Sequence, residues 1–303
     1  MSRTVIVPLD GSRFAEQALP LATAIARAAG SSLHLVHVHQ SLVFEGLPYS
    51  EHDQGWDIEA RRQELDYLGE TAERARAAAT IGVHVELLEG DPAKSVLEYA
   101  RKVDAELVVM ATHGRGGIAR AWLGSVADEL VRKAELPLLL VRPAGEDPVD
   151  LAGLPDVRRV LIPLDGSRLA EHVIAPAMRV GDVFGASYTL LRVIIPTFVP
   201  GAPQIARAID EDRLLGVARE RETREYLAHV QERLSESGAT VDTRIAVGSP
   251  AQTILDQADE IGADLIAIAT HGRGATLRAF LGSVADKVVR GSTRPVLVYR
   301  PRT

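Results

Sequence analysis

The chain repeats itself, and this duplication limits its possible folds more than any other feature. The segment Val108–Leu130, VVMATHGRGGIARAWLGSVADEL, returns near the C-terminus as IAIATHGRGATLRAFLGSVADKV over Ile266–Val288. A second motif, VIVPLDGSR from Val5, returns as VLIPLDGSR from Val160. Because both motifs recur in the same order at nearly the same separation, the sequence predicts two whole domains rather than a short solenoid repeat.

The length of the chain agrees with two domains. At 303 residues it can form two ordinary domains that each bury a core. The joint falls in 143–155, PAGEDPVDLAGLP, whose prolines, glycines and acidic residues suit an exposed linker. We therefore expect a first domain over 1–145, a linker over 146–157 and a second domain over 158–303.

Each half alternates short apolar runs with helical patterns in the order β-α-β-α-β-α-β-α-β. After the second strand we expect a loop to about Trp56 and then a helix to Ala79. This alternation predicts a doubly wound α/β fold, a parallel sheet with helices on both faces. Ligands of such sheets bind beyond the carboxyl ends of the strands, where the strand order reverses. In the first half the strands are expected at Thr4–Leu9, Leu33–Val38, Val83–Leu88, Leu107–Ala111 and Leu138–Val141.

Composition narrows the classes of function. The formal net charge of −7 provides no basic field that would favour nucleic acid or anionic lipid. The chain has no cysteine, which excludes disulfides, thiolate metal sites and thiol catalysis. The start MSRTVIVPLDG lacks the apolar segment of a signal peptide, and no apolar run approaches the roughly 20 residues that span a bilayer. We expect a soluble cytoplasmic protein that binds neither nucleic acid nor membrane.

The glycine-rich turn after the fourth strand is the strongest candidate site. Gly114 and Gly117 permit left-handed backbone or close approach of a ligand, and Gly124-Ser125 opens a helix whose amides point outward. Phosphates bind in such cradles, although an ordinary β-α loop also uses glycine to turn. The spacing of Gly114, nine residues and Gly-Ser recurs from Gly272, which favours the phosphate interpretation. The pattern is neither a P-loop nor a dinucleotide fingerprint.

These motifs together resemble one family. A-x-x-G-(nine residues)-G-S after the fourth strand, with P-L-D-G-S after the first, is similar to the universal stress protein family in its tandem two-domain form, over nearly the whole chain. The resemblance implies two five-stranded parallel sheets of order 3-2-1-4-5. It also implies one adenine nucleotide per domain, with ATP, alone or with Mg²⁺, as the ligand.

The family's nucleotide-binding pattern begins with a glycine where this chain has Ala111 and Ala269. An alanine at positive φ would cost on the order of 1 kcal/mol. At an ordinary φ its methyl group would only narrow the pocket.

The resemblance assigns roles residue by residue. Asp10 and Asp165 would contact adenine or ribose, and Val38 and Val193 would meet adenine through their backbone. The glycine-rich turns and the helix starts after them would line the phosphates. The full expected nucleotide-binding set is Pro8, Asp10, Val38, Ala111, Gly114, Arg115, Gly117, Gly124, Ser125 and Val126, with Pro163, Asp165, Val193, Ala269, Gly272, Arg273, Gly282, Ser283 and Val284.

Several of these residues have a second interpretation. Asp10 and Asp165 could only make a turn or cap the following helix. Arg115 and Arg273 could clamp phosphate oxygens or could be solvated. His113, next to the turn, could act as acid or base, or could orient the loop by hydrogen bonding.

The second strand of the first half, LHLVHVH over Leu33–His39, carries histidines at strand spacing that could suggest a metal site. The second copy reads YTLLRVI over Tyr188–Ile194 and loses all three. We therefore expect no shared metal site.

The leading functional hypothesis is an ATP-binding regulatory protein of the stress response. The alternatives are a slow ATPase and a dimerising scaffold with vestigial pockets. No lysine lies in the glycine-rich turns and no base has a paired partner, so we expect no catalytic residues and at most weak ATP hydrolysis. The apolar last strands, Leu138–Val141 and Val296–Tyr299, would be sheet edges that invite pairing. The resemblance implies an internal pseudo-dimer, and we expect a homodimer on top of it.

Overall fold

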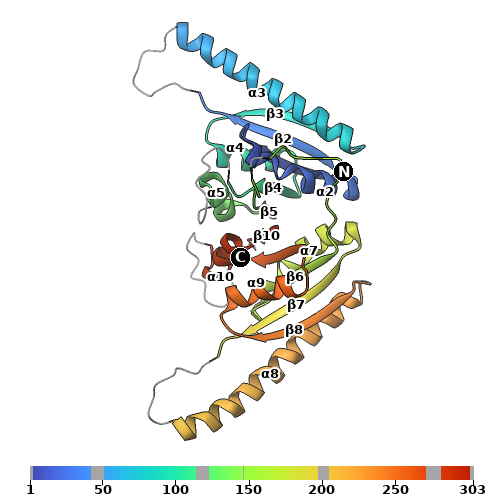
Figure 1. The fold of residues 1–303 in the computed structure, drawn as a ribbon, viewed down its shortest axis with the longest axis vertical. Helices are drawn as coiled ribbons and strands as arrows, with labels where there is room; N and C mark the ends of the chain where they lie inside the picture. Colours follow the sequence, from blue (N-terminus) through green and yellow to red (C-terminus); the bar gives the residue numbers. More distant parts are fainter. Residues whose placement is uncertain are drawn as a thin grey trace. The chain divides into compact units, whose positions relative to one another are not determined.

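The chain forms two compact units, Met1–Asp156 (unit 1) and Val157–Thr303 (unit 2). The computed structural model in Figure 1 describes residues 3–41, 51–113, 123–145, 147–196, 205–270 and 281–300. The division lies between Asp156 and Val157, and the linker over 146–157 stays a prediction.

Unit 1 has a parallel sheet with the strand order β3-β2-β1-β4-β5 in its described residues. This order confirms the prediction of 3-2-1-4-5. The strands are β1 (Thr4–Leu9), β2 (Ser32–His39), β3 (Val83–Glu89), β4 (Leu107–Ala111) and β5 (Leu138–Val141). The helices are α1 (Arg13–Glu16), α2 (Leu19–Ala29), α3 (Glu51–Ala78), α4 (Pro92–Lys102) and α5 (Ser125–Lys133).

Unit 2 repeats this arrangement with the order β8-β7-β6-β9-β10 in its described residues. Its strands are β6 (Arg159–Pro163), β7 (Ser187–Ile194), β8 (Val241–Val247), β9 (Leu265–Ala269) and β10 (Val296–Tyr299). Its helices are α6 (Arg168–Glu171), α7 (Ile174–Gly181), the 3-10 turn η1 (Asp182–Phe184), α8 (Ile205–Ser235), α9 (Pro250–Glu260) and α10 (Ser283–Gly291).

The central strands explain the layering. Every residue of β4, LVVMA, and of β9, LIAIA, is buried. Consecutive residues of a strand point to opposite faces, so a strand buried throughout requires helices on both faces of its sheet. The continuous apolar runs in the sequence therefore lead directly to the doubly wound architecture.

The long helices pack through a narrow stripe. In α3, Leu68, Ala72 and Ala75 are fully buried, while most of the remaining described positions are charged or polar. The expectation of a loop to about Trp56 was wrong, because α3 begins at Glu51. Its first turns are too polar to display apolar periodicity. None of the helices in the described residues has an apolar stretch long enough to cross a bilayer.

The two units differ in the residues at one pair of matching core positions. Unit 1 has Ala26 on α2 and Leu33 on β2, where unit 2 has Gly181 and Tyr188. Tyr188 is 1% exposed, and its hydroxyl donates to Asp182 Oδ1 at 2.5 Å. A Cβ at Gly181 would lie 2.5 Å from that hydroxyl oxygen. The glycine therefore makes room for the larger ring.

This difference in core packing leads to a prediction about stability. Gly181→Ala should destabilise the protein by about 1–3 kcal/mol because the methyl overpacks a filled core. Urea unfolding followed by circular dichroism measures the change. In a Tyr188→Leu background the same substitution should cost much less.

The matched control is Gly69→Ala in α3, where an added Cβ meets no atom within 4 Å. It should stabilise slightly through helix propensity. A Gly181→Ala variant as stable as this control would contradict the packing argument.

Candidate functional site

Each unit has a cavity at the carboxyl edge of its sheet. The cavity volume is about 450 Å³ in unit 1 and about 890 Å³ in unit 2. In unit 1, β1 pairs with β2 on one side and with β4 on the other. In unit 2, β6 pairs likewise with β7 and β9. The connections after these strands diverge, and the cavities lie where the strand order reverses.

The fold brings the sequence-predicted residues together in both units. Pro8, Asp10, Val38, Ala111, Gly124, Ser125 and Val126 line the cavity of unit 1. Pro163, Asp165, Val193, Ala269, Gly282, Ser283 and Val284 line the cavity of unit 2. The remaining predicted residues, Gly114, Arg115, Gly117, Gly272 and Arg273, lie outside the described residues.

The start of α5 is fixed to the end of β4 by one backbone contact. The Gly124 N–H donates to the Thr112 carbonyl oxygen at 2.8 Å, and Gly282 and Thr270 make the same bond in unit 2 at 2.8 Å. A Cβ on Gly124 would lie 3.2 Å from the Thr112 oxygen, so this close approach favours glycine.

The N-cap residues of α5 and α10 provide no side-chain cap for the amides of the first turn. Gly124 and Gly282 occupy the N-cap positions and provide no side-chain acceptor. The first N–H groups of a helix carry partial positive charge and require an acceptor. At the edge of a cavity, these amides suit an anion.

The two aspartates after β1 and β6 make identical turns. Asp10 Oδ1 accepts from the Ser12 backbone N–H at 2.9 Å and from its hydroxyl at 2.6 Å. Asp165 Oδ1 and Ser167 repeat these bonds at 2.9 and 2.6 Å. The turn-making interpretation is therefore correct. Both residues also line their cavities, so their ligand role stays a prediction compatible with the turn.

Ala111 and Ala269 carry no backbone strain. Among the non-glycine residues that the structure describes, Asp104 alone has a positive φ. The alanines that replace the first motif glycine therefore have ordinary backbone, and their methyl groups line the cavities. Of the two outcomes considered from the sequence, the structure shows the one with ordinary φ, in which the alanine methyl group only narrows the pocket.

His113 provides a polar atom at the unit 1 cavity. Its Nδ1 lies 3.0 Å from the Thr112 hydroxyl oxygen. Its Nε2 is buried and has no hydrogen-bond partner among the described residues. A buried polar nitrogen without a partner is costly, and a polar ligand in the cavity could satisfy it.

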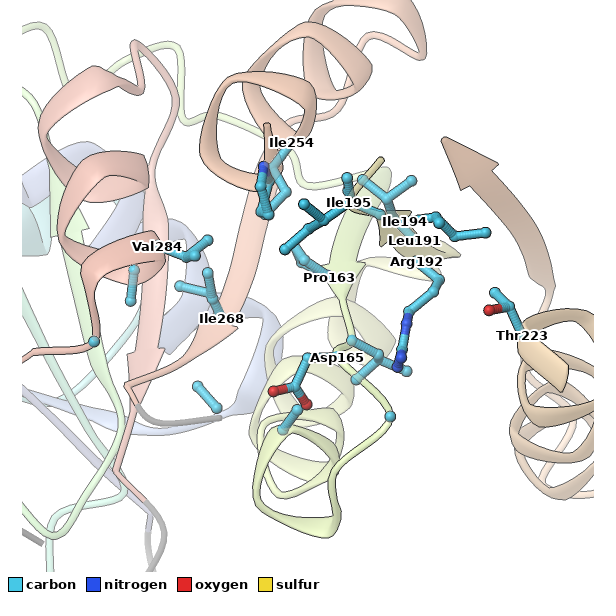
Figure 2. A pocket seen from close by; sticks show the side chains of 18 of the residues that line it. Pro163, Asp165, Leu191, Arg192, Ile194, Ile195, Thr223, Ile254, Ile268 and Val284 are labelled. Atoms are coloured by element: carbon cyan, nitrogen blue, oxygen red, sulfur yellow. The ribbon is translucent and has the colours of Figure 1, made fainter. Parts of the chain in front are cut away.

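Sequence reasoning missed part of each cavity wall. In unit 2, Asp165, Arg192 and Thr223 surround the cavity from three different parts of the fold (Figure 2). Thr223 and Tyr226 belong to α8, in which no motif marks them. Arg192 could have been noticed as the one charged residue of the apolar strand YTLLRVI. The other missed residues include His37 and Met110 in unit 1 and Ile254 and Ile268 in unit 2.

Arg192 and Tyr226 form one wall of the unit 2 cavity. The guanidinium carbon of Arg192 lies 5.8 Å from the centroid of the Tyr226 ring, within cation–π range. The Tyr226 hydroxyl donates to Glu171 Oε1 at 3.1 Å. Burial and the Glu171 carboxylate raise the pKa of Tyr226. The phenol is therefore a neutral hydrogen-bond donor at all physiological pH values.

Two α/β units, each with a parallel sheet and a pocket where its strand order reverses, place the chain in the class of tandem doubly wound α/β proteins. The universal stress protein family model matches residues 1–142 and 156–300, and the chain belongs to this family.

Individual proteins similar to this chain agree with its assignment to the family. Universal stress protein Rv2005c of Mycobacterium tuberculosis is 28% identical over 302 residues, 98% of this chain and 96% of that protein. A universal stress protein of Thermus aquaticus is 36% identical over 146 residues, 47% of this chain and all of that protein. The crystal structure of a universal stress protein from Archaeoglobus fulgidus superposes with a TM-score of 0.70 at 19% identity over the whole of both chains, which supports the fold.

The turn at Asp10 gives a second stability prediction. Asp10→Ala should lose both bonds to Ser12 and cost about 1–2 kcal/mol of unfolding free energy. Asp10→Asn keeps an acceptor oxygen and should cost much less. Chemical denaturation of the two variants checks this difference. Equal losses in both would show that the carboxylate charge, rather than the turn, stabilises unit 1.

Proposed function

We propose that the protein binds ATP, one adenine nucleotide in each unit, and acts as a regulatory protein of the stress response. The observation that carries the proposal is the recurrence of one site in both units. An aspartate follows the first strand, and an uncapped Gly-Ser helix start follows the fourth.

The cavity residues suit the parts of an adenine nucleotide. The amides at Gly124-Ser125 and Gly282-Ser283 would receive phosphate oxygens, together with the turns that carry Arg115 and Arg273. Asp10 and Asp165 would accept hydrogen bonds from ribose or adenine, and the backbone of Val38 and Val193 would border the base. Mg²⁺ bound to the triphosphate would need few protein ligands, because it keeps several waters.

The size and chemistry of the cavities support the proposal. Small-molecule sites typically occupy about 300–1,000 Å³ and combine an apolar lining with a few convergent polar groups. Both cavities fall in this range, and both join apolar strand residues to the aspartate after the first strand and to one helix start, with Glu222 as a second carboxylate in unit 2. His113 Nε2, which has no hydrogen-bond partner in the described part of the chain, adds a donor or acceptor in unit 1.

Binding without rapid turnover fits the residues better than catalysis. No lysine is among the described residues that line either cavity. Each aspartate is already bonded to a serine within its own turn. A slow hydrolysis of ATP remains the alternative, and it would depend on the same aspartates.

Nucleotide content tests the proposal. Protein purified from cells and then denatured should release close to two adenine nucleotides per chain, quantified by mass spectrometry. The double variant Asp10→Asn/Asp165→Asn keeps the turns and should bind added ATP at least about tenfold more weakly, since it loses charge-assisted hydrogen bonds.

Two outcomes would contradict the binding account. No released nucleotide together with no calorimetric signal on adding ATP would favour a scaffold with vestigial pockets. Substantial ATP hydrolysis that disappears in the double variant would favour an enzyme.

We further propose that the edge strands mediate association. In the order of its own sheet, β5 is terminal in unit 1, and β10 is terminal in unit 2. Both are short and apolar, and such edges tend to pair with other strands. We expect the two units to act as an internal pseudo-dimer and two chains to pair again. Light scattering coupled to size-exclusion chromatography should give the mass of two chains, and a mass of one chain at all concentrations would exclude the second pairing.

A further inference from the structure

The two units differ where the long helix meets the end of the second strand. In unit 1, His39 ends β2 and is 3% exposed. Its Nδ1 lies 2.7 Å from Glu64 Oε2, and its Nε2 lies 2.9 Å from Asp57 Oδ1. Both carboxylates belong to α3, so one buried ring joins the helix to the strand.

The geometry favours the charged form of this ring. A neutral imidazole has a single N–H and can donate to one acceptor, whereas the imidazolium donates from both nitrogens. Burial disfavours the charge on His39, but the hydrogen bonds to Asp57 and Glu64 outweigh it and raise the pKa of His39. Arg61, followed by His39 itself, holds the pKa of Asp57 well below its usual range, so Asp57 is an acceptor.

Other charged groups complete the cluster. Arg61 on α3 donates to Asp57 Oδ2 at 2.8 Å and to Glu89 Oε1 on β3 at 2.5 Å. His37 Nε2 lies 3.4 Å from Glu64 Oε1. Ser41 hydrogen-bonds to Asp57. Three carboxylates thus face Arg61 and two imidazoles among the described residues. Loss of the proton from His39 would add to the excess of negative charge in the cluster and break one of its two bonds.

This cluster is not arranged as a metal site. No group of three or more histidine, aspartate or glutamate side chains in the described part of the chain could hold a metal ion. The short contacts are hydrogen bonds between groups of opposite charge. Their role is to hold elements together.

The cluster borders the unit 1 cavity. His37, Val38 and Gln40 line that cavity, and His39 lies within the same segment. The segment that would meet the adenine base is therefore attached to α3 through the His39 ring. A change in the charge of the His39 ring therefore acts directly on the neighbouring residues that line the cavity.

Unit 2 provides an internal comparison. The counterparts of His37 and His39 are Arg192 and Ile194, because the strand motifs align without gaps. The helices align through Tyr67 and Tyr226, and Thr223 then takes the place of Glu64.

The contacts of the helices support this alignment. Arg74 Nη1 on α3 binds Glu16 Oε2 at 2.8 Å, and Arg233 Nη2 on α8 binds Glu171 Oε2 at 2.6 Å. No histidine–carboxylate bond is therefore possible at these aligned positions of unit 2, where Thr223 instead lines the larger cavity.

We infer that His39 is a positioning residue of the unit 1 pocket: its imidazolium fixes α3 against the end of β2, so unit 1 binds nucleotide more tightly while His39 carries its proton. Because the pKa of folded His39 is raised, the contact is complete below the ordinary histidine pKa. It is lost as the pH rises through the folded value. Unit 2 lacks this dependence. The inference rests on the proposed nucleotide binding.

The test is calorimetric titration of the nucleotide-free full chain with ATP from pH 6 to pH 9. One of the two sites should weaken by about fivefold or more as the pH rises, a typical coupling between adjacent sites. His39→Ile, which introduces the residue of unit 2, should remove this difference and leave that site at its weaker affinity. Comparison at each pH cancels the ionisation of ATP itself.

Two further variants separate positioning from simple stability. Asp57→Asn keeps the shape but removes one carboxylate, so the pH profile should flatten while the fold remains. His34→Gln is the matched control. This half-buried histidine of the same strand bonds the Tyr99 hydroxyl at 2.9 Å, away from the cluster, and its loss should leave the profile unchanged.

A readout without nucleotide distinguishes the two proposals. Hydrogen exchange over residues 57–64 should accelerate at high pH in the wild type, after correction for the intrinsic pH effect, and not in His39→Ile. If ATP binds neither site at any pH, the proposed function fails, whatever the exchange data show. If ATP binds both sites and the wild type and His39→Ile share one pH profile, the inference about His39 is wrong.

Discussion

The close contact between the Gly124 N–H and the Thr112 carbonyl, repeated by Gly282 and Thr270, is the constraint on which the rest of the site depends. It anchors a helix start to the end of a fully buried strand. The uncapped amides are thereby held on the rim that carries Asp10, about a hundred residues earlier in the chain. A parallel sheet whose order reverses at β1 makes this meeting unavoidable.

Much of the fold could be predicted because its signals are local or repeated. Buried strands such as LVVMA are apolar runs in the sequence, and the recurrence of each motif in both halves strengthened its interpretation. The strand order came from the family resemblance, since periodicity does not specify which strands are neighbours. The start of α3 was missed because its first turns are polar and show no amphipathic pattern.

The remainder of the site could not be predicted because it depends on pairs that only the fold brings together. In the sequence His39 is one of several histidines at strand spacing, and no motif marks Asp57 or Glu64 in the helix that follows. Their burial against one another follows from the docking of α3 on β2. Arg192 and Tyr226 are likewise distant in sequence and adjacent in space. The two units thus share their motifs but have pockets of different chemistry.

The most direct test of two working nucleotide sites is a crystal structure of the chain grown with ATP. The account predicts density for a nucleotide in both units, with the base beside Val38 and Val193 and the phosphates at the helix starts of Gly124 and Gly282. Density for the phosphates at another position, or no nucleotide density in either unit at saturating ATP, would contradict this prediction.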